Sequence, residues 1–353
     1  MPPGAPEELS AASRLFGVGI SGPELTERES RLLRESPPRA VILFRRNIES
    51  SEQLDRLVDA LRRLPGQPFL CVDQEGGPVD RFRDLLGASI SFRAAADRGS
   101  ARRAGELAGD VCARFGIGVD LAPVVDRLIP GESERVLGER AAAQDPEAVA
   151  RAADEFLDGL HNRGVGGCLK HFPGLGRAKL DTHVALPLLS RDADGEARDL
   201  LPYERVMEKA GAVMISHAAG EDGIPASLSP ARATGLLRGS LGFSGAAFSD
   251  DLEMGALSSF GDLSQRCVAA SRAGCDLLFL CKETEALPEC VRAVERDVSR
   301  ERREEAHRRV EGYTRHLERL APFRPPTGRP LAEMAADIRT LREGERGTES
   351  SPA

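Results

Sequence analysis

The loop that begins at Lys170-His171 and continues to Asp181-Thr182-His183 carries the densest group of side chains that could move a proton. Two glycines and a proline within residues 170–183 favour an irregular, extended loop over a helix. In an extended segment, residues two apart point the same way, so Asp181 and His183 can project together. A carboxylate that bonds an imidazole fixes its tautomer and raises its basicity, which is what a general acid/base needs. A metal-binding Asp-x-His pair is the alternative, although no further ligand set accompanies it.

Further charged candidates stand at the ends of short apolar runs. They are Asp73 with Glu75, Asp120 with Asp126, Lys170 with His171, His217, and Asp250 with Asp251. Any one of these groups has an ordinary structural explanation, because an Asp after a strand often caps a helix and a His there is often structural. Five of the eight apolar runs end in such a group, however, which predicts a shared site at one end of the strands.

Eight runs of apolar and β-branched residues would have to position these side chains. They cover residues 15–20, 40–44, 69–72, 117–121, 167–170, 212–216, 246–249 and 276–281. Apolar runs of this length without alternation are typical of strands buried on both faces of a parallel sheet, and helical patterns lie between them. The pattern predicts an α/β protein, a single (β/α)8 TIM-type barrel with its active site at the carboxyl ends of the strands. An open, doubly wound sheet is the alternative, but the first βα turn has no Gly-x-Gly-x-x-Gly fingerprint.

Helix-start signals separate the runs. Ser50 and Gln53 form a capping-box pattern, and Asp145-Pro146 and Ser229-Pro230 each place an N-cap residue before a proline. Beyond residue 322 the chain is rich in proline, with one expected helix over 331–342 and then a polar tail. We therefore expect one catalytic domain at residues 1–322 and a Pro-rich, partly disordered tail at 323–353.

The composition argues against several classes of partner. The chain has 353 residues, and its 48 basic and 56 acidic residues give a net charge of −8, which does not favour nucleic acid or an anionic membrane. The N-terminus lacks the pattern of a signal peptide and no apolar stretch is long enough to span a bilayer, so we expect a cytoplasmic location. The seven cysteines, which include no CxxC pair, are expected to be buried free thiols.

Ordered motifs along residues 15–290 resemble those of glycoside hydrolase family 3, specifically its single-domain bacterial β-N-acetylglucosaminidases. The matching segments are 42–48 (ILFRRNI), 72–77 (VDQEGG), 121–126 (LAPVVD), 137–140 (LGER), 170–176 (KHFPGLG), 181–183 (DTH), 248–252 (FSDDL) and 273–276 (AGCD). Larger members of the family take a carboxylic acid/base from a second domain, for which this chain has no room. The Asp-x-His loop is instead the mark of the N-acetylglucosaminidase branch, an exception to the usual pair of carboxylates.

The resemblance implies a retaining glycosidase, a β-N-acetylhexosaminidase, that releases terminal non-reducing β-linked N-acetylglucosamine from small saccharides, with muropeptides of cell-wall recycling as the expected source. It implies Asp250 as the nucleophile, His183 as the acid/base and Asp181 as the residue that orients His183. The residues implied to bind or line the sugar site are Asp73, Arg81, Arg140, Lys170, His171 and His217. We expect no metal or other cofactor, and a monomer whose partner is the saccharide. Because the chain has no Trp and only two Tyr, it offers few flat faces for a long glycan.

Three positions depart from the family pattern. Pro78 stands where Arg is usual, Leu175 where His is usual, and Ala141-Ala142 where Ser and an aromatic residue are usual. None of them is assigned to chemistry, although Leu175 lies in the catalytic loop. The alternatives are a β-glucosidase or β-xylosidase of the same family, a sugar-binding protein with weakened catalysis, and a Schiff-base aldolase that uses Lys170.

Overall fold

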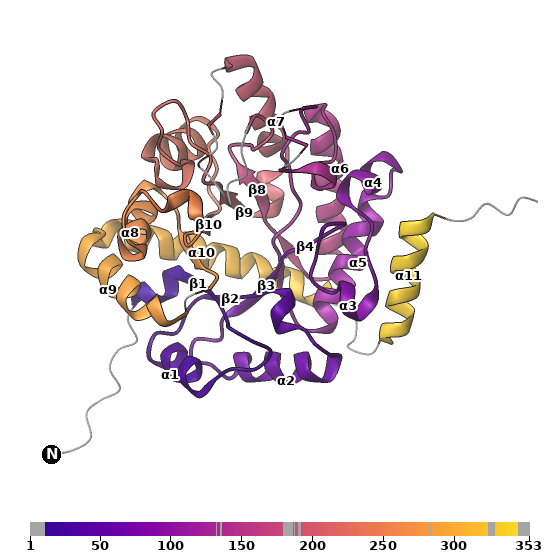
Figure 1. The fold of residues 1–353 in the computed structure, drawn as a ribbon, viewed down its shortest axis with the longest axis horizontal. Helices are drawn as coiled ribbons and strands as arrows, with labels where there is room; N and C mark the ends of the chain where they lie inside the picture. The colour runs from indigo at the N-terminus through magenta and orange to yellow at the C-terminus, as the bar shows by residue number, and fades with distance from the viewer. Residues whose placement is uncertain are drawn as a thin grey trace, which may run out of the picture.

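A closed barrel of parallel strands forms the centre of the molecule (Figure 1). The computed structural model describes residues 11–131, 133–134, 136–178, 186, 188–189, 192–282, 284–323 and 329–344. In this part of the chain, nine strands pair in the order β7-β6-β3-β2-β1-β11-β10-β9-β8. Their bounds are β1 Phe16–Gly19, β2 Ala40–Leu43, β3 Phe69–Val72, β6 Val119–Asp120, β7 Gly166–Gly167, β8 Leu169–Phe172, β9 Ala212–Ile215, β10 Ala246–Asp251 and β11 Leu277–Leu280. Because only Cys168 separates β7 from β8, the two are parts of one run, and the sheet closes into the predicted barrel of eight strand runs.

Every neighbouring pair of strands in the barrel is parallel. Val18 of β1, for example, lies opposite Val41 of β2 on one side and opposite Leu280 of β11 on the other. The carboxyl ends of all the strands therefore meet at one mouth of the barrel, which is where an enzyme of this fold places its chemistry.

Helices cover the outside of the barrel. The longer ones are α1 Glu27–Glu35, α2 Ser51–Arg62, α5 Ala101–Arg114, α6 Pro146–His161, α7 Ala193–Ala210, the π-helix η5 Ala231–Ser240, α8 Leu263–Ala273, α9 Leu287–Asp297 and α10 Arg300–Leu320. Between β3 and α5 lie the antiparallel hairpin of β4 Gln74–Gly76 and β5 Val79–Asp80 and the short helices α3 Arg83–Leu86 and α4 Phe92–Asp97. Single helical turns occur at η1 Ala11–Leu15, η2 Arg45–Asn47, η3 Gly138–Arg140, η4 Ala226–Leu228, η6 Gly255–Leu257, η7 Thr284–Ala286 and η8 Ala321–Phe323.

Two of the three predicted helix starts have the expected N-cap bond, whereas η5 has Pro230 as its N-cap and no side-chain cap bond from Ser229. Asp145 accepts a hydrogen bond from the Ala148 N–H, and Ser50 accepts one from the Gln53 N–H. The second half of the expected capping box does not form, because the Gln53 side chain accepts from Glu49 instead of from the N-cap residue. Helix α2 still begins at Ser51, directly after the predicted N-cap residue.

The inside of the barrel is filled by side chains, and α10 closes its lower end. Ile42, Met214, Phe248 and Phe279 belong to one buried cluster together with Tyr313 of α10. The Tyr313 hydroxyl donates to the Gly167 carbonyl oxygen at 2.9 Å, which ties α10 to the strand run β7–β8. The described interior of the barrel is therefore a packed core below the mouth, so a ligand of the barrel would bind at the mouth.

The chain after residue 322 includes helix α11, Leu331–Glu343, where the sequence predicts one. Figure 1 shows α11, in yellow, alongside α5 and α3 on the outside of the barrel. All seven cysteines are buried and free, as expected. None of the helices in the described part of the chain is long and apolar enough to cross a membrane.

Candidate active site

A cavity of about 480 Å³ opens at the carboxyl ends of the barrel strands. The residues that line it come from β2, β3, the β4–β5 hairpin, the loop after β6, the β8 region, β9, β10 and β11. They are Ile42, Phe44, Arg46, Asp73, Glu75, Val79, Arg81, Leu121, Val136, Arg140, Lys170, His171, Leu175, Met214, Asp250, Asp251, Met254, Phe279, Cys281 and Lys282. Six of the nine residues predicted for the site, Asp73, Arg81, Arg140, Lys170, His171 and Asp250, are among them, so strands far apart in sequence bring these groups together.

Alternating acids and bases form one side of this cavity. Lys170 Nζ donates to Asp73 Oδ1 at 2.8 Å and lies 2.5 Å from Glu75 Oε1. Arg81 Nη2 bonds the other oxygen of Asp73 at 2.9 Å. Arg140 binds Glu75 with two hydrogen bonds, at 2.8 and 3.0 Å. Two buried carboxylates are thus neutralised by three cations whose remaining N–H groups can reach sugar hydroxyls.

The network keeps its members ionised. Burial alone would raise the pKa of Asp73, but Lys170 and Arg81 outweigh it and hold that pKa well below its usual value. Burial likewise opposes ionisation of Glu75, whereas Arg140 and Lys170 lower its pKa to about 2. Burial would lower the pKa of Lys170, but Asp73 and then Glu75 raise it above its usual value. A Schiff-base lysine must present a neutral amine, so the aldolase alternative does not fit this residue.

His171 is held in one tautomer by its two neighbours. Its Nδ1 lies 2.7 Å from Asp126 Oδ2, and its Nε2 lies 3.2 Å from Arg140 Nη2. Because a guanidinium only donates, Nε2 accepts and Nδ1 carries the proton that is donated to Asp126. Asp126 also accepts from the Leu175 N–H at 2.7 Å. This single carboxylate therefore orients the imidazole and fixes the start of the loop that leads to Asp181.

Asp250 and Asp251 both line the cavity but are engaged differently. Asp251 Oδ1 accepts from the main-chain N–H groups of Glu253 at 3.1 Å and Cys281 at 3.3 Å. Burial raises the pKa of Asp251 to about 6. Asp250 accepts from the Asp251 N–H at 2.8 Å, and no ion pair among the described residues involves its carboxylate. Burial opposes its ionisation, but the nearby imidazoles of His217 and His171 and the Lys170 ammonium lower its pKa.

His217 is not among the residues that line this cavity. Its side chain is completely buried behind β10, with Nδ1 2.7 Å from Ser227 Oγ and Nε2 2.8 Å from the Asp251 carbonyl oxygen. Burial lowers the pKa of His217. Residue type and position after a strand predicted the right neighbourhood, but they do not tell whether a ring faces the mouth or packs beneath it.

Asp181 and His183, which are predicted for this site, lie outside the described residues. Of the three departures from the family pattern, Leu175 lines the cavity, and its main-chain N–H makes the bond to Asp126 whatever side chain it carries. Pro78 is exposed at the turn of the β4–β5 hairpin and is absent from the wall. Ala141 and Ala142 are buried and are not among the residues that line the cavity.

Sequence reasoning placed Glu75, Asp120 and Asp126 at strand ends in the predicted shared site but assigned them no role. Glu75 turns out to be the partner of Arg140, and Asp126 the partner of His171. Asp120 is buried below the cavity, accepts from the Gln74 N–H through Oδ1, and keeps Oδ2 without a hydrogen-bond partner. Burial raises the pKa of Asp120 to about 7. The available signal was the same strand-end position that identified Asp73 and Lys170.

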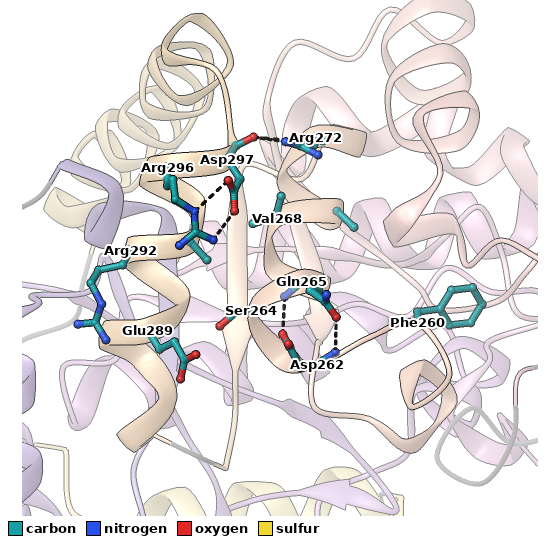
Figure 2. Close-up of a pocket in the computed structure, with 12 residues that line it drawn as sticks. Phe260, Asp262, Ser264, Gln265, Val268, Arg272, Glu289, Arg292, Arg296 and Asp297 are labelled. Carbon is teal, nitrogen blue, oxygen red and sulfur yellow. Dashed lines mark hydrogen bonds and ion pairs between the residues drawn. The ribbon is translucent and has the colours of Figure 1, made fainter.

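A second hollow, of about 880 Å³, lies away from the mouth between α8 and α9 (Figure 2). Arg296 pairs with Asp297 in its lining, and Asp262 and Gln265 form the capping box that begins α8. It contains none of the residues predicted for chemistry. Across the described part of the chain, no three His, Cys, Asp or Glu side chains gather in a way that could hold a metal ion.

Comparisons with known proteins identify the family of this chain. Residues 16–312 match the family model described as the glycosyl hydrolase family 3 N terminal domain. A protein named "Beta-hexosaminidase" from Alkalilimnicola ehrlichii is 38% identical over 78% of this chain and 82% of its own length. NagZ from Neisseria gonorrhoeae, solved with N-trifluoroacetyl-D-glucosamine, superposes with a TM-score of 0.73 at 28% identity, over 91% of this chain and 98% of that one. A family 3 β-N-acetylglucosaminidase from Paenibacillus sp. FPU-7 gives a TM-score of 0.82 at 26% identity, over 96% of this chain and 69% of that one. The chain belongs to glycosyl hydrolase family 3.

Proposed function

We propose that this chain is a retaining β-N-acetylglucosaminidase that removes terminal, non-reducing β-linked N-acetylglucosamine from small saccharides. The observation that carries the proposal is the state of Asp250, whose carboxylate is favoured as the anion at the barrel mouth and is not held by an ion pair in the described structure. The names of the relatives, which are hexosaminidases and N-acetylglucosaminidases, support the choice of sugar.

In the proposed reaction, Asp250 attacks the anomeric carbon and the bond to the leaving oxygen breaks. His183 gives its proton to that oxygen, and a glycosyl-enzyme ester remains. His183 then takes a proton from water, the water oxygen attacks the anomeric carbon, and the Asp250 carboxylate is released. Two displacements at one carbon return the original β configuration, which is the meaning of retention.

The choice of Asp250 over Asp251 rests on what each carboxylate already does. Asp251 is bonded to two main-chain N–H groups, so movement toward a sugar would break both bonds. Its raised pKa also means that the Asp251 carboxylate holds its proton to a higher pH than the Asp250 carboxylate does. Asp250 makes one local bond and keeps a lowered pKa, as an attacking carboxylate requires.

The sugar itself would be held by the network around Lys170. Asp73 and Glu75 can accept from hydroxyl groups, while Lys170, Arg81 and Arg140 can donate. His171 completes this set. A polar wall of paired charges with few aromatic faces suits one small ring better than a long glycan.

Asp181 is proposed to orient His183 on the loop after β8, and residues 1–322 to form the catalytic domain with 323–353 as its tail. We further propose that the natural substrates are muropeptide fragments of cell-wall recycling, that the enzyme is a cytoplasmic monomer, and that it needs no metal. The chemistry above uses one carboxylate and one imidazole, which is why no metal is invoked.

Hydrolysis of nitrophenyl N-acetyl-β-glucosaminide, followed by proton NMR, tests the proposal. We expect N-acetylglucosamine to be released first as the β anomer, at a rate that a chelator does not change. Faster cleavage of nitrophenyl β-glucoside or β-xyloside would change the sugar and keep the mechanism. Release of the α anomer, or binding of N-acetylglucosamine without turnover, would refute the proposed reaction.

A further inference from the structure

Helix α11 lies beyond residue 312, where the family match ends, yet it packs on the barrel close to the candidate active site. Met334 and Ile338 of this helix are buried, and Leu331 and Leu341 pack partly buried against the same core. These residues recur at intervals of three and four, so one face of α11 is apolar and rests on α5 and α3. Its packing, and not helix propensity alone, keeps it in place.

Ion pairs and hydrogen bonds anchor α11 along its length. Asp337 accepts from Arg103 Nη2 at 2.7 Å and also pairs with Arg329. Arg329 Nη1 donates to Asp110 Oδ2 of α5 at 2.9 Å. At the other end, Arg98 Nη1 donates to a carbonyl oxygen in the last turn of α11 at 2.9 Å, which satisfies one of the open acceptors there. The helix is thus attached at its start, middle and end.

The apolar face of α11 shares a small void with α5 and the β4–β5 hairpin. Ile338 and Leu341 share a small void of about 20 Å³ with Gln74 and Gly76 of β4 and with Ser89. Gly76 lies so close to the neighbouring segment that a Cβ built on it would meet the Ile90 carbonyl oxygen at 2.1 Å. Residues of the hairpin line the candidate active-site cavity through Glu75 and Val79, and they line the void shared with α5 and α11 through Gln74 and Gly76.

Hydrogen bonds connect this contact to the sugar-binding network. Ser89 donates its N–H to Asp80 Oδ2 at 2.8 Å, and Gln74 Nε2 donates to Asp80 Oδ1 at 2.9 Å. Gln74 Oε1 accepts from the Arg81 N–H at 3.0 Å, and the Arg81 guanidinium bonds Asp73. A hairpin of three and two residues is marginal by itself, so it needs support from outside.

We propose that α11 is a brace for the β4–β5 hairpin. By holding the hairpin in place, the helix keeps Glu75 and Arg81 in their positions relative to Lys170. Loss of the brace lets the hairpin move and weakens the grip on the sugar, while Asp250 on β10 stays in place. The effect on substrate rests on the proposed function, but the effect on the hairpin does not. The helix is then part of the binding machinery and not an independent tail.

The test uses the full chain and the substitution Ile338→Asp, which places a charge against α5 and releases the helix. Arg339→Asp, at the adjacent exposed position, is the matched control, and Ile338→Leu keeps an apolar side chain. For Ile338→Asp we expect kcat/KM on nitrophenyl N-acetyl-β-glucosaminide to fall by about 10–100-fold, mainly through a higher KM. Both other variants should behave as the parent. Hydrogen exchange of the amides at 74–81 should accelerate only in Ile338→Asp.

The exchange measurement needs no substrate. It therefore tests whether α11 supports the hairpin even where the proposed hydrolysis is not observed. Where Ile338→Asp does not fold, Asp337→Ala, which removes the anchors to Arg103 and Arg329, is judged by the same two measurements. Faster hydrogen exchange at the α11 amides, together with unchanged exchange at 74–81, would overturn the proposal. So would an equal loss in the Arg339→Asp control, or a loss confined to kcat.

Discussion

The Nε2 atom of His217 lies 2.8 Å from the main-chain carbonyl oxygen of Asp251. Because a carbonyl only accepts, Nε2 carries the ring proton, and Nδ1 must accept from the Ser227 hydroxyl, 2.7 Å away. This bond connects the end of β9 to the end of β10, directly after Asp250. A buried imidazole therefore holds the strand end that presents the proposed nucleophile, and it does so from behind the cavity.

The first prediction concerns this support. His217→Phe fills the space but removes one hydrogen bond to the Asp251 carbonyl oxygen, which still accepts from the Met254 N–H at 3.0 Å. The loss costs about 0.5–1.5 kcal/mol of stability and lets the strand end move. We expect kcat to fall with little change in KM. His217→Gln, whose terminal amide can donate at the Nε2 position, should recover most of kcat. A higher KM with unchanged kcat in His217→Phe would show that His217 touches the sugar, as the sequence suggested.

Asp120 gives a prediction about stability and pH. Burial raises its pKa to about 7, so the folded chain binds more protons than the unfolded chain between about pH 4 and pH 7. This group therefore lowers the free energy of unfolding as pH rises through that window. Asp120→Asn keeps an oxygen acceptor for the Gln74 N–H and cannot ionise.

We compare the free energy of unfolding of Asp120→Asn with that of the parent at each pH. The advantage of the variant should be about 1–3 kcal/mol larger at pH 8 than at pH 4. Denaturant unfolding at the two pH values measures this. Asp97→Asn, at an exposed position, is the control and should show no such dependence. An Asp120→Asn variant that loses stability at pH 8 would mean that the folded chain stabilises the ionised carboxylate.

The sequence predicts the strand-end positions well and the pairings poorly. Asp73, Lys170 and Asp250 follow apolar runs, and parallel strands bring such positions to one mouth by geometry alone. The partners of these groups depend on where loops lie in space. Arg140, for example, comes from the region after β6 and is 65 residues from Glu75, a separation about which periodicity says nothing.

Orientation is the other feature that the sequence does not specify. His217 stands after a strand just as His171 does, but one ring is buried against Ser227 and the other lines the cavity. The expected helix after residue 330 is confirmed, yet its contacts with the hairpin follow from packing against α5 that no local pattern encodes.

His183 leads to a prediction from its two tasks. As acid it protonates the leaving oxygen, and as base it activates water, each worth about 10²–10⁴ in rate. His183→Ala should lose that much on substrates with poor leaving groups. With nitrophenolate, which departs without a proton, the first step should be nearly normal and the second slow, so a burst appears.

Azide, which attacks without being deprotonated, should relieve the second step in His183→Ala and give a β-glycosyl azide. Asp181→Ala should behave like a milder version, because it removes the group that orients the imidazole and not the proton carrier. Equal losses on good and poor leaving groups, without an azide effect, would limit His183 to binding.

The nucleophile is the central claim, and trapping tests it most directly. A fluorosugar based on N-acetylglucosamine slows the second displacement, so the glycosyl-enzyme ester accumulates and can be mapped by peptide mass spectrometry. We predict the label on Asp250, and no label and no turnover in Asp250→Asn, whose fold should be unchanged. Label on Asp251, or retained turnover in Asp250→Asn, would contradict the account.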